Sequence, residues 1–175
     1  VRDDLVSAYE EAGLYREAIQ QLGKVIESQP EFPDSFLRLG DLYAKIGDDT
    51  AALANYGRAV ALHPDYLEAA VKIGTVHLRL GAYLEAAHWF NRAVEINDRL
   101  LTAYIGLGVA QHEAGQTADA LASFEMGANI EPNSTLLFSE TARLQLKTSV
   151  NRQMERYLNP SEMAQEKPAS ATLSA

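Results

Sequence analysis

The apolar positions of this chain follow a helical spacing that is interrupted at regular intervals. In one such stretch, Phe36, Leu39, Gly40 and Tyr43 fall at i, i+3, i+4 and i+7, which is the spacing of one helix face. We therefore predict a helix from about Pro33 to Ile46.

A turn and a second helix follow this first one. Gly47 is predicted to end the first helix, because only glycine takes the left-handed C-cap without a steric cost. Asp48 and its neighbours offer side-chain acceptors to the free amides of the next helix. That helix is predicted to close before Pro64 and to carry its small and apolar residues on one face: Ala52, Tyr56 and Ala59.

The same pattern occurs four times, at a spacing of 34 residues. The copy at Tyr43, Gly47, Ala52, Tyr56, Ala59 and Pro64 has counterparts at Tyr9, Gly13, Ala18, Leu22, Val25 and Pro30, at His77, Gly81, Ala86, Phe90, Ala93 and Asp98, and at Gln111, Gly115, Ala120, Phe124, Gly127 and Pro132. A fixed period of this length indicates a solenoid, in which each unit buries its apolar face by stacking on its neighbours.

Small and large residues alternate with the same period. We expect the glycines of the first helices to face the alanines of the second helices at a close crossing, with the large residues filling the space between units. These sets are Gly40, Gly74 and Gly108; Ala18, Ala52, Ala86 and Ala120; and Leu22, Tyr56, Phe90 and Phe124.

From residue 1 to about Ser134 this pattern resembles the tetratricopeptide repeat (TPR) family, with departures at Ala70, Asp98 and Gln111. The resemblance implies an all-α, right-handed solenoid of four helix pairs, with repeats at about 1–32, 33–66, 67–100 and 101–134. An array needs a terminal element that tolerates water, so we expect a capping helix at about 135–157 to complete a domain of residues 1–158. The polar remainder, 159–175, is expected to be a disordered tail.

The composition narrows the classes of function. Acidic residues outnumber basic ones 24 to 15 across 175 residues, giving a formal charge of −9, so the chain lacks the basic footprint of a nucleic-acid-binding protein. No run of apolar residues is long enough to span a membrane, and the absence of cysteine excludes disulfides without fixing the compartment. Since Val1 is not an initiator methionine, either upstream residues were removed or the chain is a piece of a longer protein.

The sequence offers no recognisable catalytic chemistry. The four histidines, His63, His77, His88 and His112, do not have the spacing of metal ligands, and neither a phosphate-binding loop nor a nucleophile motif is present. We expect no enzymatic activity, no metal and no cofactor.

Resemblance to TPR proteins places a ligand in a concave groove lined by the first helix of each pair. The candidate groove residues are Leu37, Arg38, Asp41, Lys45, Val71, Lys72, Thr75, Leu78, Arg79, Ile105, Val109 and His112. Five of them (Leu37, Val71, Leu78, Ile105 and Val109) are apolar residues that we expect packing to leave open, which indicates a binding patch. The predicted function is that of an adaptor or scaffold that binds a peptide or partner protein. Its acidic side chains would pair with four cations of the groove, Arg38, Lys45, Lys72 and Arg79, and its apolar side chains would contact the apolar groove residues.

One specific use of the groove is not supported. Family members that grip the C-terminal carboxylates of heat-shock chaperones use Lys, Asn and Arg at positions that correspond here to Asp3, Ser7, Arg38, Glu68 and Lys72. Only Lys72 keeps a comparable charge, and Asp3 and Glu68 would repel a carboxylate.

Three alternatives remain open at this point. The first is that the chain is a targeting or regulatory region of a larger enzyme. The second is that it is a subunit that self-associates through its first repeat or Trp89. The third is that its own C-terminal segment fills the groove. Trp89 either wraps over a neighbouring helix or forms an exposed apolar contact.

Overall fold

The computed structural model describes residues 2–136, 139–140 and 144. The chain divides into two compact units, 1–134 and 135–175, and the first contains eight helices. They are α1 (Arg2–Glu11), α2 (Tyr15–Ser28), α3 (Pro33–Lys45), α4 (Asp49–Leu62), α5 (Leu67–Arg79), α6 (Tyr83–Ile96), α7 (Leu101–Glu113) and α8 (Thr117–Ile130). Most of the predicted capping helix (135–157) and all of the predicted tail (159–175) lie outside the described residues.

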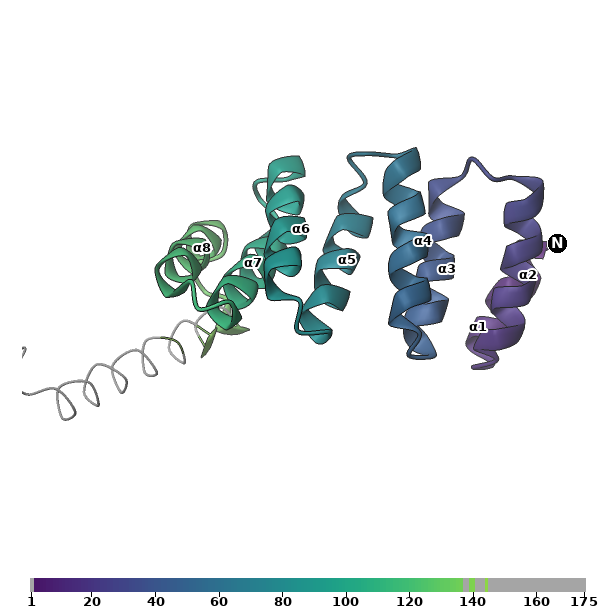
Figure 1. Cartoon of the computed structure of the whole chain (residues 1–175), viewed down its shortest axis with the longest axis horizontal. Coiled ribbons are helices and arrows are strands. Elements are labelled where there is room, and N and C mark those ends of the chain that lie inside the picture. Colours follow the sequence, from purple (N-terminus) through teal and green to yellow (C-terminus); the bar gives the residue numbers. More distant parts are fainter. Residues whose placement is uncertain (1, 137–138, 141–143, 145–175) are drawn as a thin grey trace, which may run out of the picture. The chain divides into compact units, whose positions relative to one another are not determined.

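The helices of residues 2–134 form four pairs that follow one another in chain order (Figure 1). We call α1, α3, α5 and α7 the A helices and α2, α4, α6 and α8 the B helices. Each A helix packs against the B helix of its own pair, and α3, α5 and α7 also pack against the preceding B helix. The predicted all-α solenoid of helix pairs is confirmed, and no helix in the described part of the chain is long and apolar enough to cross a membrane.

The turn inside each pair is built by glycine, as predicted. Gly13, Gly47, Gly81 and Gly115 have φ values of +73°, +80°, +73° and +83°, in the left-handed region that side chains other than glycine adopt only at a cost. After Gly47, the Asp48 carboxylate accepts a hydrogen bond of 3.0 Å from the Ala51 amide, so Asp48 caps α4 as expected.

The close crossing within the second, third and fourth pairs brings a glycine against an aromatic ring. A Cβ atom added at Gly40 would lie 2.4 Å from the Tyr56 ring, and one at Gly108 would lie 2.5 Å from the Phe124 ring. The atoms nearest to these glycines belong to the large residue of the B helix, so the aromatic ring packs at the crossing itself. The alanines of the set, Ala18, Ala52, Ala86 and Ala120, are fully buried.

Phe90 meets glycine on two sides. A Cβ atom at Gly74 of its own repeat would lie 3.0 Å from the ring, and one at Gly106 of the next repeat would lie 2.4 Å from it. The ring thus fills space within the third repeat and at the interface with the fourth, as predicted from its size.

Trp89 wraps over its neighbours, which resolves one alternative. Its half-buried side chain packs against two core clusters, one centred on Phe36 and Tyr56 and the other on Ala70 and Ala93. The guanidinium of Arg92 lies 5.9 Å from the centre of its ring, so the indole is a packing element.

The glycine–ring contact predicts opposite effects for two glycine-to-alanine changes. Gly40→Ala should lower the free energy of unfolding by about 1–3 kcal/mol, because a methyl group has no room beside Tyr56. Gly57→Ala lies in the middle of α4, where an added Cβ meets nothing within 4 Å, and should raise that free energy by roughly 0.5–1 kcal/mol through better helix propensity.

Urea unfolding followed by circular dichroism measures both values. Equal stability of the two variants would mean that the crossing has space for a side chain, contrary to the packing described.

Candidate functional site

The A helices form one surface of the solenoid, called here the A-helix face, and it contains a hollow of about 400 Å³. This first hollow is lined by residues of α1, α3 and α5: Glu10, Arg38, Asp41, Ala44, Lys45 and Lys72. Four of the six belong to the candidate groove residues predicted from the sequence. Its three cations outnumber its two carboxylates, although the solenoid as a whole is acidic.

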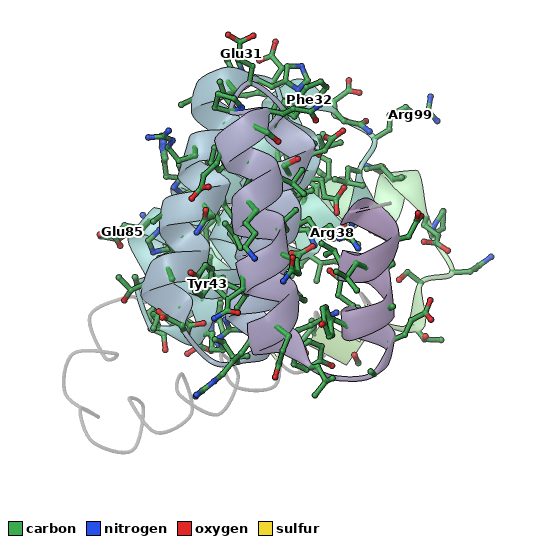
Figure 2. All side chains as sticks on the ribbon, turned by 90° about the vertical axis from the view of Figure 1, so that its right-hand side faces the viewer. Glu31, Phe32, Arg38, Tyr43, Glu85 and Arg99 are labelled. Atoms are coloured by element: carbon green, nitrogen blue, oxygen red, sulfur yellow. The ribbon has the colours of Figure 1, made fainter. Side chains whose placement is uncertain are left out.

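Arg38 joins the first two repeats across this hollow. Its Nε donates to Glu10 Oε1 at 2.9 Å, and its Nη2 donates to Glu10 Oε2 at 3.2 Å and to Ser7 Oγ at 2.9 Å. Figure 2, which looks along the solenoid from its first repeat, shows Arg38 on the A-helix side beside α1. The guanidinium is therefore held by three hydrogen bonds in one position.

Lys72 joins the second and third repeats in a similar way. Its Nζ lies 2.9 Å from Asp41 Oδ1 and 3.4 Å from Glu68 Oε1. Partial burial lowers the pKa of Lys72, but the hydrogen bond and charge of Asp41, together with Glu68, outweigh burial and raise its pKa above the usual value. Lys72 is thus held in its charged form.

Asp41 connects this ion pair to the core. Its Oδ1 accepts a hydrogen bond of 2.7 Å from the hydroxyl of Tyr56, whose ring packs against Gly40. Burial, followed by the hydrogen bond to Asp41, strongly raises the pKa of Tyr56. A single tyrosine therefore supports both the packing of the second repeat and the position of its carboxylate.

The other two candidate cations reach back to the preceding B helix. Lys45 Nζ lies 5.2 Å from the ring centre of Tyr15, at the start of α2. Arg79 pairs with both carboxylate oxygens of Asp49, at the start of α4, with 3.1 Å between its Nε and Asp49 Oδ2. That hydrogen bond raises the pKa of Arg79.

This arrangement stops at the interface between the third and fourth repeats. One period after Lys72 the chain has Gly106, and one period after Arg79 it has Glu113. Gly106 instead receives the ring of Phe90. The last interface is therefore apolar where the first two are bridged by charges.

The apolar candidates are less open than predicted. Leu37 is only 7 % exposed and packs with Phe36 and Ile73, so the expectation that it faces an open groove is wrong: α5 packs over it. Val71 and Leu78 are half-buried against the cluster around Phe90. The remaining predicted groove residues lie on the same A helices: Thr75, which is exposed, and Ile105, Val109 and His112, which are half-buried.

A second hollow, of about 530 Å³, was not foreseen from the sequence. It lies where α5 and α7 begin and is lined by His63, Asp65, Tyr66, Leu67, Glu68, Val71, Leu100 and Thr102. Its turn residues His63, Asp65, Tyr66 and Leu100 were not among the predicted groove residues, and nothing in the 34-residue period indicates that consecutive turns enclose a space. Of the twelve candidate groove residues named from the sequence, Val71 lines this hollow.

The residues that line the two hollows do not form a metal centre. Within the described portion of the chain, no three His, Asp or Glu side chains are grouped as a metal ion would require. The polar groups described above form ion pairs and hydrogen bonds between repeats.

The sequence comparison agrees with this geometry. The model of the tetratricopeptide repeat matches residues 4–58 and again residues 37–99, which together exceed half of the chain. The chain belongs to the tetratricopeptide repeat family. No sequence among curated proteins matches this TPR chain.

Solved structures with the same fold include other TPR proteins. MamA 41-end from Desulfovibrio magneticus RS-1 has a TM-score of 0.79 and 17% identity, covering 95% of this chain and 96% of that one. YrrB, described as a TPR protein with an unusual peptide-binding site, has a TM-score of 0.70 and 24% identity, with coverages of 78% and 71%. The first TPR of Spaghetti (RPAP3), bound to the HSP90 peptide SRMEEVD, has a TM-score of 0.64 and 20% identity, with coverages of 67% and 93%.

The raised pKa of Tyr56 predicts how the stability of this TPR solenoid responds to alkaline pH. In the unfolded chain Tyr56 loses its proton near pH 10, whereas the native chain retains it to higher pH. Between about pH 10 and 12 the unfolded state therefore binds fewer protons, and this one group lowers the free energy of unfolding by up to about 1.4 kcal/mol per pH unit as pH rises.

The Tyr56→Phe variant should show a shallower fall over that window, measured by urea unfolding at several pH values. Parallel slopes for wild type and Tyr56→Phe would contradict the bond to Asp41.

Proposed function

We propose that this chain is a protein-interaction module that binds a peptide segment or partner protein along its A-helix face. The first hollow is the centre of the proposed site, and the observation that carries the proposal is its excess of pre-positioned cations. A cavity of about 400 Å³ is in the size range of ligand sites and suits one or two side chains of an extended peptide.

The cations of the A-helix face have internal partners and still have hydrogen-bond donors for a ligand. Arg38 uses Nε and Nη2 in the bonds described, and Arg79 likewise uses Nε and Nη2. A guanidinium carries five N–H donors and an ammonium three, so Arg38, Arg79 and Lys72 each retain at least one for an incoming carboxylate. An acidic side chain of the partner can therefore be added without breaking an interface between repeats.

The internal ion pairs make the site selective. A cation that is already held in place loses less side-chain entropy on binding than a free one. Each carboxylate partner also screens its cation, so a lone acidic group gains little, and apolar contacts must supply the remaining affinity. Val71, Ile105 and Val109, half-buried on the same face, are the proposed anchors.

The relatives support this class of function. YrrB is described as having a peptide-binding site, and the Spaghetti repeat was solved with a bound peptide. The way in which family members hold a C-terminal carboxylate does not carry over, because Glu68 stands at one of the required positions and itself contacts Lys72.

The proposal predicts that reversing two cations weakens partner binding. Lys72→Glu/Arg79→Glu should reduce capture of partner proteins from a lysate by roughly tenfold or more, the effect of losing about 1.4 kcal/mol of binding free energy. Capture is quantified by mass spectrometry on the immobilised full chain.

The matched control is Arg16→Glu/Lys24→Glu, which makes the same charge change at exposed positions of α2. Circular dichroism and thermal melts establish that both variants are folded. If the folded groove variant captures the same proteins as wild type, those cations have no part in binding.

A further inference from the structure

We propose that the second hollow binds a bulky apolar side chain whose neighbour in the partner peptide is Lys or Arg. This inference rests on the proposed function and adds the chemistry of a second contact. It differs from the acidic contact expected at the first hollow.

The floor of the second hollow is apolar and held in place. Leu67, Val71 and Leu100 pack on the cluster of Ala70, Ala93 and Ala103. The Tyr66 ring is fixed at one edge, because its hydroxyl donates to Asp34 Oδ1 at 2.5 Å and its ring centre lies 5.5 Å from that of His63. A preformed apolar surface of this kind suits a Leu, Met, Phe or Trp side chain.

The charges of the lining have one sign. Asp65 and Glu68 line the hollow, and no Lys or Arg does. Both acids are exposed, and within the described residues Asp65 forms no ion pair. The nearby Arg92 donates to the Pro64 carbonyl at 2.7 Å and lies over Trp89, and Figure 2 shows Arg99 extending outward from the α6–α7 turn.

The field of the whole solenoid has the same sign. Residues 1–134 contain twenty Asp and Glu against ten Lys and Arg. A basic residue beside an apolar anchor is therefore attracted on approach and in the bound position, whereas an acidic one is repelled.

Helix α5 links the two hollows. Lys72 lines the first, Glu68 and Val71 line the second, and the Glu68–Lys72 ion pair lies between them. One extended segment can thus place an acidic residue at the first hollow and an apolar residue with its basic neighbour at the second. The bound segment would have a defined direction across α5.

Selection from a phage-displayed library of random dodecapeptides on the immobilised full chain tests this inference. We expect the enriched peptides to contain an apolar residue adjacent to Lys or Arg. A representative synthetic peptide should bind about tenfold more weakly to Thr102→Arg, which places a cation and added bulk at the exposed edge of the hollow. Selection on Asp65→Lys should shift the neighbour's preference away from basic residues.

Glu125→Lys is the matched control for Asp65→Lys, since it makes the same charge change at an exposed position of α8. Selection on this control should enrich the same peptides as selection on the wild-type chain. Enriched peptides that lack the apolar–basic pair, or that bind Thr102→Arg as well as wild type, would overturn the inference. If enriched peptides of this kind still bind Lys72→Glu/Arg79→Glu more weakly than wild type, the proposed function stands without the second-hollow contact. Failure to enrich any peptide above uncoated beads would count against both.

Discussion

In the second, third and fourth repeats, the approach of the A helix to the aromatic ring of its B helix is the contact on which the other interactions of the solenoid depend. Gly40 allows α3 to lie against the Tyr56 ring, and Gly108 does the same for α7 and Phe124. Because protein interiors are close-packed, a side chain at either glycine would push the two helices apart. The distances between repeats would then change as well, since every A helix after the first also packs on the preceding B helix.

Tyr56 carries this constraint from the core to the surface. Its ring is buried against Gly40, and its hydroxyl holds Asp41, which in turn pairs with Lys72 of the next repeat. The ion pairs of the A-helix face are partly exposed, so each contributes only about 0–1 kcal/mol to stability. Their main effect is to fix the positions of charged groups on the face proposed to bind a partner.

The sequence was sufficient to predict the elements of each repeat. The 34-residue period identified the helices, the turn at Gly47, the cap at Asp48 and the large residue of each B helix, because these depend on local spacing and on turns that only some residues can form. Contacts between repeats were harder. The pairs formed by Arg38, Lys72 and Arg79 join residues 28, 31 and 30 positions apart, and these offsets depend on how one repeat is rotated against the next.

The same rotation explains what was missed at the candidate site. The 34-residue period predicts that Leu37 of α3 is exposed in the groove, yet α5 covers it. The second hollow forms between the turn before α5 and the turn before α7, so its existence depends on the spacing of two repeats. Four residues of the first hollow could be named from the sequence, whereas their ionic partners Glu10 and Asp49 could not be assigned to them.

The cations that bridge the repeats all point in one direction along the chain. Arg38 and Lys45 contact the first repeat, and Lys72 and Arg79 contact the second. Because a ribosome releases a chain from its N-terminus and folding follows that order, each of these side chains emerges when its partner has already been synthesised. The array can therefore grow one helix pair at a time, and each added pair brings the cations that pair with groups already present in the pair before it.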